Sequence, residues 1–361
     1  MRFNQKAIYL SVLCLVLAPF FSNYKLIESV SIGDALVAIF FSFYLFALKV
    51  VRWKSGTVII AGYLILIFIA FIENNLFEVN AGFFRLCFYS FICLVIPFGQ
   101  LNDKLFWVFV EKLSLFFSIS VLLQFFAQQM GYSLLLSLPI DSVEQDTLSI
   151  IDHVYRSGGW FREPSYLVLF LTPFLLYQSS QRQWFKFSIG AVASVISTSS
   201  LAVFVLIAIF IKMLFSPNTR SVERLGFIFV FAACTGWFLF NSGNIFVDRV
   251  FEIFADGGTL NERFMPIIEN FGSIYSFWPS SVAYNNFLEL SRVNQVWFSS
   301  ASNLLASLGL SGLILFIAGI SRTGVIYFFF MICIIFTTHV VATSFSIYLI
   351  LALHYMHRRR I

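Results

Sequence analysis

The chain has 361 residues, of which 59% are hydrophobic and only 11% are charged, and its formal net charge is +5. Soluble globular domains carry about 25% charged residues, so a chain this apolar needs lipid as its solvent. The composition therefore argues against a soluble domain and against a disordered tail, and it indicates an integral membrane protein.

Apolar runs separated by polar breaks predict an all-α, polytopic protein with about twelve transmembrane helices, several of them near the ~20 residues that cross a bilayer. The first run follows Arg2 and Lys6 but lacks a small-residue cleavage site, so we interpret it as an uncleaved span. The stretches 184–215 and 323–356 could each be one long helix or two, and polar midpoints favour two. The predicted spans are 7–23, 31–48, 56–72, 82–98, 106–127, 165–178, 184–198, 200–215, 225–241, 299–320, 323–338 and 342–356.

The basic residues predict the orientation, because lysine and arginine concentrate in cytoplasmic loops. An even number of spans with both termini in the cytoplasm puts all but seven of the 23 basic residues at the cytoplasmic face of the membrane. Five of those seven lie in two long outer loops, at about 128–164 and 242–298, within a single membrane domain spanning 1–361. The seven are Lys25, Arg85, Arg156, Arg162, Arg249, Arg263 and Arg292.

The first outer loop ends at residues 156–165 with the sequence RSGGWFREPS, which leads directly into a predicted span. Pro164 suits the first turn of that helix, and Glu163 lies near its N-cap. Arg156 and Arg162 flank a helix start that carries the positive end of the helix dipole, an arrangement that binds anions.

Two interpretations of this loop fit equally well. In one, it binds a pyrophosphate or sugar phosphate, with Gly158 and Gly159 letting the backbone close around the ligand and Glu163 acting as a base or orienting an arginine. In the other, it is a helix cap with an Arg–Glu pair that holds the loop to the membrane surface.

The second outer loop contains apolar residues at helical spacing over 247–254 and 264–271, which predicts two short amphipathic helices at the membrane surface. Arg249 and Arg263 lie on their polar sides, either as anion ligands or in local salt bridges with neighbouring glutamates. Trp278 offers an aromatic face for a sugar, although such residues also form the interfacial aromatic belt.

Three further residues are ionisable and lie near predicted span ends. Arg85 lies near the outer end of the fourth span, where it could snorkel, pair with Glu73 or Glu78, or contact a lipid phosphate. Asp34 occupies a similar place in the second span. His339, in a short outer turn, is either a catalytic base or a structural residue.

Motifs that bind nucleotides or metals are missing from the sequence. It contains no Walker A motif, no G-x-G-x-x-G and no H-E-x-x-H, so an ATP-driven pump, a dinucleotide enzyme and a zincin are unsupported. The cysteines lie in apolar runs without C-x-x-C spacing, so we expect small buried side chains, no metal and no cofactor. They are Cys14, Cys87, Cys93, Cys234 and Cys333.

The pattern Arg156-x-x-Gly159-x-Phe161-x-Glu163-Pro164-Ser165 at the head of a span resembles the signature of the O-antigen polymerase family, the Wzy-type oligosaccharide repeat-unit polymerases. The layout that follows is also similar, with a basic inner loop at 181–186, a span, a polar break at 198–200 and another span. The resemblance covers about 156–320. At 199–201 this chain has Ser-Ser-Leu, where many relatives have Ser-x-Thr-Gly.

The resemblance implies a glycosyltransferase that joins undecaprenyl-pyrophosphate-linked oligosaccharide units at the periplasmic face, in O-antigen, lipopolysaccharide or related polysaccharide biosynthesis. Its expected partners are that lipid-linked substrate, membrane lipid and a chain-length regulator protein, and not nucleic acid. An O-antigen ligase and a lipid-linked oligosaccharide flippase or transporter are the alternatives. The expected catalytic residues are Arg156, Glu163, Arg263 and His339, and the expected substrate-binding residues are Arg162, Arg249, Gly159, Arg85 and Trp278.

Overall fold

The structure is a computed structural model, and its described residues are mostly helical (86%). The structure describes residues 5–22, 24–27, 30–47, 57–74, 81–96, 103–132, 158–161, 163–197, 199–215, 269, 271–294, 299–321, 330–332, 334–335, 338, 341 and 343–358. Its elements in chain order are α1 (Gln5–Phe21), β1 (Lys25–Ile27), β2 (Val30–Ser31), α2 (Ile32–Ala47), α3 (Thr57–Glu73), α4 (Ala81–Val95), α5 (Asp103–Gln129), α6 (Pro164–Ser180), α7 (Trp184–Ile196), α8 (Ser200–Phe215), α12 (Phe271–Ile274), α13 (Ser281–Asn294), α14 (Ser300–Ile320) and α16 (Ser344–Arg358).

Apart from α12 and α13, which no apolar run predicted, the described helices follow the apolar runs closely. The stretch 184–215 forms two helices, since α7 ends at Ile196 and α8 begins at Ser200, as its polar midpoint predicted. The predicted span at 225–241 and the predicted surface helix at 247–254 lie outside the described residues, as do most of 264–271 and most of 323–338.

The described helices are compatible with a membrane protein. By length and composition, α5 and α14 are able to cross a bilayer, and several apolar helices of 10–17 residues accompany them. One face of α5 exposes Val108, Phe116, Ile119, Leu123 and Phe126, whose spacing follows the helical repeat. A continuous apolar surface of this kind is typical of contact with lipid or with another protein.

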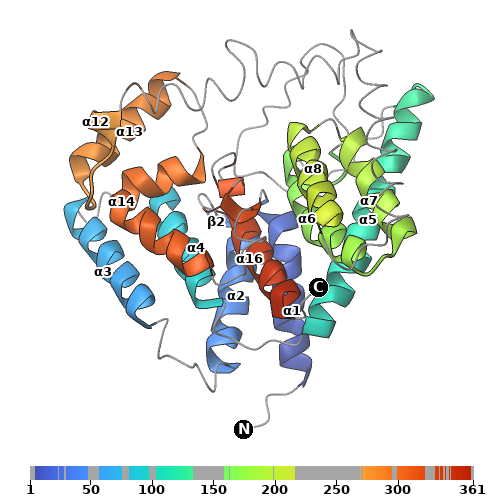
Figure 1. Cartoon of the computed structure of the whole chain (residues 1–361), viewed down its shortest axis with the longest axis horizontal. Coiled ribbons are helices and arrows are strands. Elements are labelled where there is room, and N and C mark those ends of the chain that lie inside the picture. The colour runs from blue at the N-terminus through green and yellow to red at the C-terminus, as the bar shows by residue number, and fades with distance from the viewer. Residues whose placement is uncertain are drawn as a thin grey trace. The chain divides into compact units, whose positions relative to one another are not determined.

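The chain divides into two compact units. One comprises Met1–Glu111, Pro139–Ser149 and Arg263–Ile361, and the other comprises Lys112–Leu138 and Ile150–Glu262. In the first unit, α16 packs against α1, α2 and α4, as Figure 1 shows. Every residue of α16 from Ser344 to Met356 is buried, which is typical of a central helix.

Close packing also shapes the start of the first unit. The helices α1 and α2 form a hairpin whose connection contains the antiparallel strands β1 and β2. A Cβ atom at Gly33 would lie 2.6 Å from the carbonyl oxygen of Ala18, so only glycine lets α2 approach α1 this closely.

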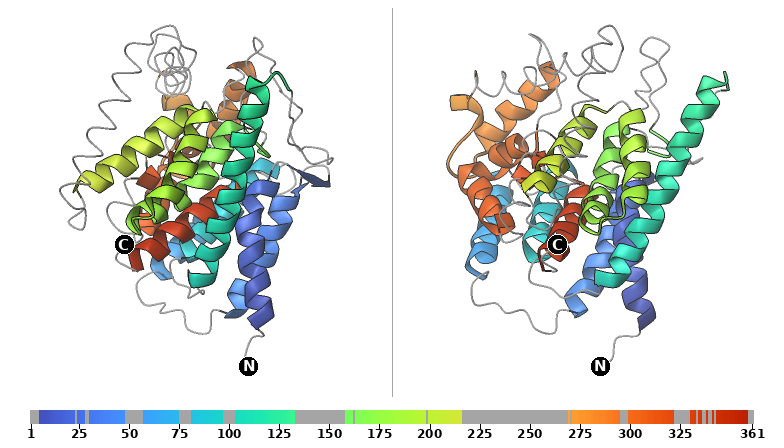
Figure 2. Two further views of the ribbon diagram at one scale, coloured as in Figure 1. Left: turned by 90° about the vertical axis from the view of Figure 1, so that its right-hand side faces the viewer. Right: turned by 45° about the vertical axis from the view of Figure 1, so that its right-hand side comes forward.

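The second unit is built on α6, α7 and α8, which pack side by side (Figure 2). The ring of Phe117, in the part of α5 that belongs to this unit, lies edge-on to Phe170 of α6 at 5.2 Å. The helix α6 is buried over most of its length. The first residues of α6 are therefore part of a closely packed helix, which holds the helix start in place.

Candidate functional site

A glycine turn precedes α6. The N–H of Phe161 donates to the carbonyl oxygen of Gly158 at 3.1 Å, and Gly159 has a left-handed φ of 62°. The N–H of Gly159 donates to Oε1 of Gln124 on α5 at 2.9 Å. A Cβ atom at position 159 would lie 2.6 Å from Cγ2 of Val121. Glycine is therefore required here because the backbone of residue 159 packs closely against α5. A role for Gly159 in ligand binding stays a prediction.

Two aromatic residues fix the same turn onto α5. The Nε1–H of Trp160 donates to Oγ of Ser120 at 3.2 Å, and its ring stacks on Phe116. Phe161 is buried and lies edge-on to Phe117 with ring centroids 4.9 Å apart. The segment 158–161 is thus held by side chains, and it sets the position at which α6 begins.

The start of α6 confirms the predicted cap. Pro164 is the first helical residue, and Glu163 is the N-cap, with an extended backbone (φ −112°, ψ 134°) and no side-chain capping bond. Oε2 of Glu163 instead accepts a hydrogen bond from Oγ of Ser165 at 3.0 Å. The Glu163 side chain is exposed, so its carboxylate is accessible to solvent at the start of α6.

Replacing Gly159 by alanine is expected to loosen this support. The added Cβ would enter the Val121 side chain, and the left-handed backbone is unfavourable for alanine by roughly 1–2 kcal/mol. We expect a lower midpoint of thermal unfolding for the purified protein. Gly131→Ala is the matched control, since Gly131 also has a positive φ (84°) but has nothing within 4 Å of its Cβ position. If both variants lower the midpoint of thermal unfolding equally, the contact between position 159 and Val121 contributes nothing to stability.

In the first unit, the start of α2 carries a second polar cluster. The N–H of Ser31 donates to Oδ2 of Asp34 at 2.8 Å, and the N–H of Asp34 donates to Oγ of Ser31 at 3.0 Å. These reciprocal bonds form a capping box, which satisfies N–H groups that the first helical turn leaves without intrahelical partners.

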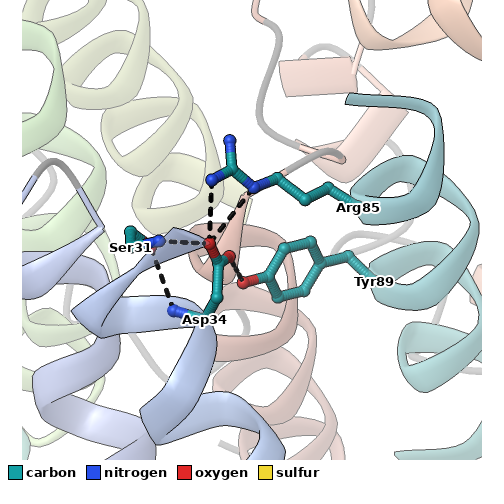
Figure 3. A network of polar contacts seen from close by, with 4 residues as sticks. All are labelled: Ser31, Asp34, Arg85 and Tyr89. Atoms are coloured by element: carbon teal, nitrogen blue, oxygen red, sulfur yellow. Dashed lines mark hydrogen bonds and ion pairs between the residues drawn. The ribbon is translucent and has the colours of Figure 1, made fainter. Parts of the chain in front are cut away.

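The same carboxylate receives two side chains of α4 (Figure 3). Nε and Nη2 of Arg85 lie 3.1 Å and 2.9 Å from Oδ2 of Asp34, and the hydroxyl of Tyr89 donates to Oδ1. The Arg85 and Asp34 side chains are 28% and 19% exposed, so the pair is only partly accessible. Arg85 therefore has a partner that sequence analysis did not assign to it. The Ser31-x-x-Asp34 spacing of a capping box and the i, i+4 spacing of Arg85 and Tyr89 were readable signals.

The helix α14 is broken at Gly309, which has φ 71° and ψ 178°. The N–H of Leu310 donates to the carbonyl of Ser276 at 2.9 Å, and the N–H of Ser311 donates to that of Phe277 at 3.1 Å. In an unbroken helix these two N–H groups would bond to carbonyls four residues earlier in α14. A segment of the second predicted outer loop is thus joined to the middle of a predicted span.

The described part of that loop also contacts α4. The ring of Tyr284 on α13 lies edge-on to the ring of Phe83, with centroids 5.4 Å apart. Phe83 is on α4, two residues before Arg85. Trp278, at the turn before α13, is 58% exposed and lies edge-on to Phe277. Burial raises the pKa of Tyr275 to about 12.

The predicted site residues are thus distributed over both units. Gly159 and Glu163 lie in the second unit, and Arg85 and Trp278 lie in the first. The remaining five lie outside the described residues: Arg156, Arg162, Arg249, Arg263 and His339. Within the residues that the structure describes, no group of three or more histidine, cysteine, aspartate or glutamate side chains is arranged to hold a metal ion.

The fold and these clusters define the class as a mostly helical protein with apolar helices compatible with a membrane. Comparison of the chain with protein-family models, with curated proteins and with solved structures gave no match. The resemblance to O-antigen polymerases accordingly stays a prediction.

Proposed function

We propose that this protein is a glycosyltransferase that joins undecaprenyl-pyrophosphate-linked oligosaccharide units at the periplasmic face of a bacterial inner membrane. About twelve spans, with both termini in the cytoplasm, belong to the proposal. The observation that supports it best is the start of α6, where Glu163 presents an exposed carboxylate on a helix whose preceding turn is fixed to α5. Arg162 directly precedes this residue in sequence, and Arg156, the arginine of the resembling motif, lies seven positions before it.

The proposed reaction transfers a growing glycan from one lipid pyrophosphate to a hydroxyl group of a second lipid-linked unit. The acceptor oxygen forms a bond to the anomeric carbon of the donor, the bond from that carbon to the pyrophosphate oxygen breaks, and the acceptor proton passes to a base. The donor is already activated, so no nucleotide is required. The leaving pyrophosphate needs positive counter-charge, and the acceptor needs a base.

The residues are assigned to these needs as follows. Arg156, Arg263 and Arg249 stabilise the departing pyrophosphate, because a guanidinium group binds phosphate through two parallel hydrogen bonds. Glu163 and His339 are the candidate bases. The glycine turn that is held on α5 supports Glu163 for this role, because a catalytic group must be held within a fraction of an ångström of its working position.

A deletion strain tests the function. Loss of a polymerase leaves single repeat units attached to lipid A core, loss of a ligase leaves unattached polymer, and loss of a flippase leaves units on the cytoplasmic side. We expect single capped units and restoration of full-length polymer by the intact gene. Either of the other two patterns would replace the proposal with the corresponding alternative.

Substitution of the outer-loop arginines tests the site. We expect Arg156→Ala and Arg263→Ala each to lower polymer formation by about 100-fold or more, as when one preorganised donor is removed from a transition state. The Arg156→Lys and Arg263→Lys variants should also form little polymer, because lysine cannot make the paired hydrogen bonds. Arg224→Ala, in a predicted inner loop, is the control. Full-length polymer from normally inserted Arg156→Ala or Arg263→Ala protein would defeat the assignment.

A further inference from the structure

The turn between α12 and α13 is fixed to α14 at the break in that helix (Figure 1). The carbonyl oxygens of Ser276 and Phe277 accept the N–H groups of Leu310 and Ser311 at 2.9 Å and 3.1 Å. The hydroxyl of Ser276 also donates to the carbonyl oxygen of Trp278. Three carbonyl groups of the turn are therefore hydrogen-bonded within the protein, and the turn lies level with the break in α14.

The packing of α14 against α3 gives the depth of that break. A Cβ atom at Gly62 of α3 would lie 3.3 Å from Cδ1 of Leu315, and one at Gly319 of α14 would lie 3.8 Å from Cγ2 of Ile59. Earlier positions on α3 thus meet later positions on α14, so the two helices run antiparallel. The break in α14 therefore lies toward the end of α3 at Glu73, which is its predicted outer end.

Exposed apolar side chains lie at this level on both helices. Continuing the same register places Leu310 opposite Phe68, within roughly two helical turns of the end of α3. Leu310 and Phe68 are both exposed, as are Ile314 on α14 and Ile72 on α3. We call these four side chains the apolar edge. Such an edge near the end of a predicted span is typical of contact with lipid.

The exposed side of the turn and of α13 changes from apolar to polar along the chain. Phe277, Trp278 and Val282 are 55%, 58% and 67% exposed. Asn285 and Glu289 are exposed as well, and they follow Val282 by three and seven residues, so all three lie on one face of α13. This face is therefore apolar where the helix begins beside α14 and polar further along.

The other side of the hairpin formed by α12 and α13 has its own core. Ile274 of α12 and Phe287 of α13 are buried together with Ala306 of α14. Nδ2 of Asn286 donates to the carbonyl oxygen of Ser273 at 2.9 Å, which joins the two helices of the hairpin. The hairpin is thus held by contacts other than its exposed apolar side chains, which remain available to a partner outside the fold.

We propose that this turn inserts into the membrane leaflet around the outer end of α3, with Phe277, Trp278 and Val282 among the acyl chains and Asn285 and Glu289 in water. Lipid is the partner because the three apolar side chains lie level with the apolar edge and continue it. Non-helical backbone at membrane depth must be hydrogen-bonded within the protein, and the carbonyl groups of this turn are. The second outer loop is then anchored in the membrane, and Trp278 contacts lipid instead of a sugar. This inference is independent of the reaction that the protein performs.

Cysteine labelling tests the insertion. The full-length protein in phosphatidylcholine nanodiscs carries Trp278→Cys, Val282→Cys, Asn285→Cys or Glu289→Cys and is treated with a water-soluble maleimide, and the unsubstituted protein gives the background of the natural cysteines. Lipid disfavours the reactive thiolate, so we expect the first two variants to be labelled about tenfold more slowly than the last two. All four should react alike after denaturation.

The variants at 285 and 289 are matched controls, because they lie on the same exposed face of α13 as Val282. Val282→Cys is a small change at an exposed position, so it remains informative if Trp278→Cys fails to fold. Equal labelling rates of Val282→Cys and the two controls in nanodiscs would place the turn in water and overturn the proposal.

Brominated lipid identifies what covers the turn. Bromine atoms on acyl chains quench the fluorescence of tryptophan rings that they contact. In nanodiscs of brominated phosphatidylcholine, we expect Trp278→Phe to lower the quenched fraction of the fluorescence. Trp107→Phe, which removes a buried tryptophan, is the control and should not lower it. A second copy of the chain that covered the turn would also slow labelling, but Trp278→Phe would then leave the quenched fraction unchanged, and that result would overturn the proposal.

Discussion

Replacing Gly309 by alanine is expected to destabilise the first unit by about 3 kcal/mol. The φ of 71° and ψ of 178° lie in a region that is essentially restricted to glycine and costs other residues of order 1–3 kcal/mol. The added Cβ would also lie 2.7 Å from the carbonyl oxygen of Phe277 and 2.7 Å from the carbonyl carbon of Trp278, both backbone atoms. We therefore expect loss of the contact between the 276–278 segment and α14.

The measurement is thermal or denaturant unfolding of the purified protein in detergent, followed by the fluorescence of Trp278 and the other tryptophans. Gly272→Ala is the matched control, since Gly272 lies in the helix α12 with nothing within 4 Å of its Cβ position. Alanine is a better helix former than glycine, so this control should be neutral or slightly stabilising. If Gly309→Ala is as stable as Gly272→Ala, the break in α14 is not required for stability.

The second large effect is expected at Asp34. Asp34→Ala removes one of the two reciprocal hydrogen bonds of the capping box, worth about 0.5–1.5 kcal/mol, and takes away the carboxylate that pairs with Arg85. Removing one member of a fully buried pair costs about 3–5 kcal/mol, and partial exposure of both side chains lowers that figure here to about 2 kcal/mol. We expect a total loss of about 3 kcal/mol in the free energy of unfolding.

A double-mutant cycle isolates the ion pair from the cap. Asp34→Ala combined with Arg85→Ala should be less destabilising than the two single changes added together, with a coupling energy of about 1–2 kcal/mol. Asp34→Asn serves as a milder variant, because its amide oxygen still accepts the N–H of Ser31 while the charge is lost. Strict additivity of the two alanine changes would mean that the contact between α2 and α4 contributes no coupling.

Features that depend on neighbours in sequence were predictable. Apolar runs predicted the described helices other than α12 and α13, since burying an apolar segment in lipid requires a structure that satisfies its own backbone hydrogen bonds. The helix α13 is polar over much of its length, and no apolar run predicted it. The cap at Glu163 and Pro164 followed from proline chemistry at a first helical turn, and the division between α7 and α8 followed from polar residues at 198–200. The capping box of Ser31 and Asp34 is equally local, and its spacing was available in the sequence.

Features that depend on distant contacts came only from the tertiary structure. Residues 299–320 predict an unbroken span, and Gly309 breaks it because carbonyls from residues 276 and 277 replace the helix's own acceptors. Arg85 meets Asp34 across 51 positions of sequence because the Arg85 side chain on α4 reaches the carboxylate at the start of α2. Position 159 needs glycine because Val121 on α5 lies too close for a Cβ atom. No pattern in the neighbouring sequence reveals this contact. Local chemistry thus determined where helices begin and end, and packing between segments decided where they break and which charges pair.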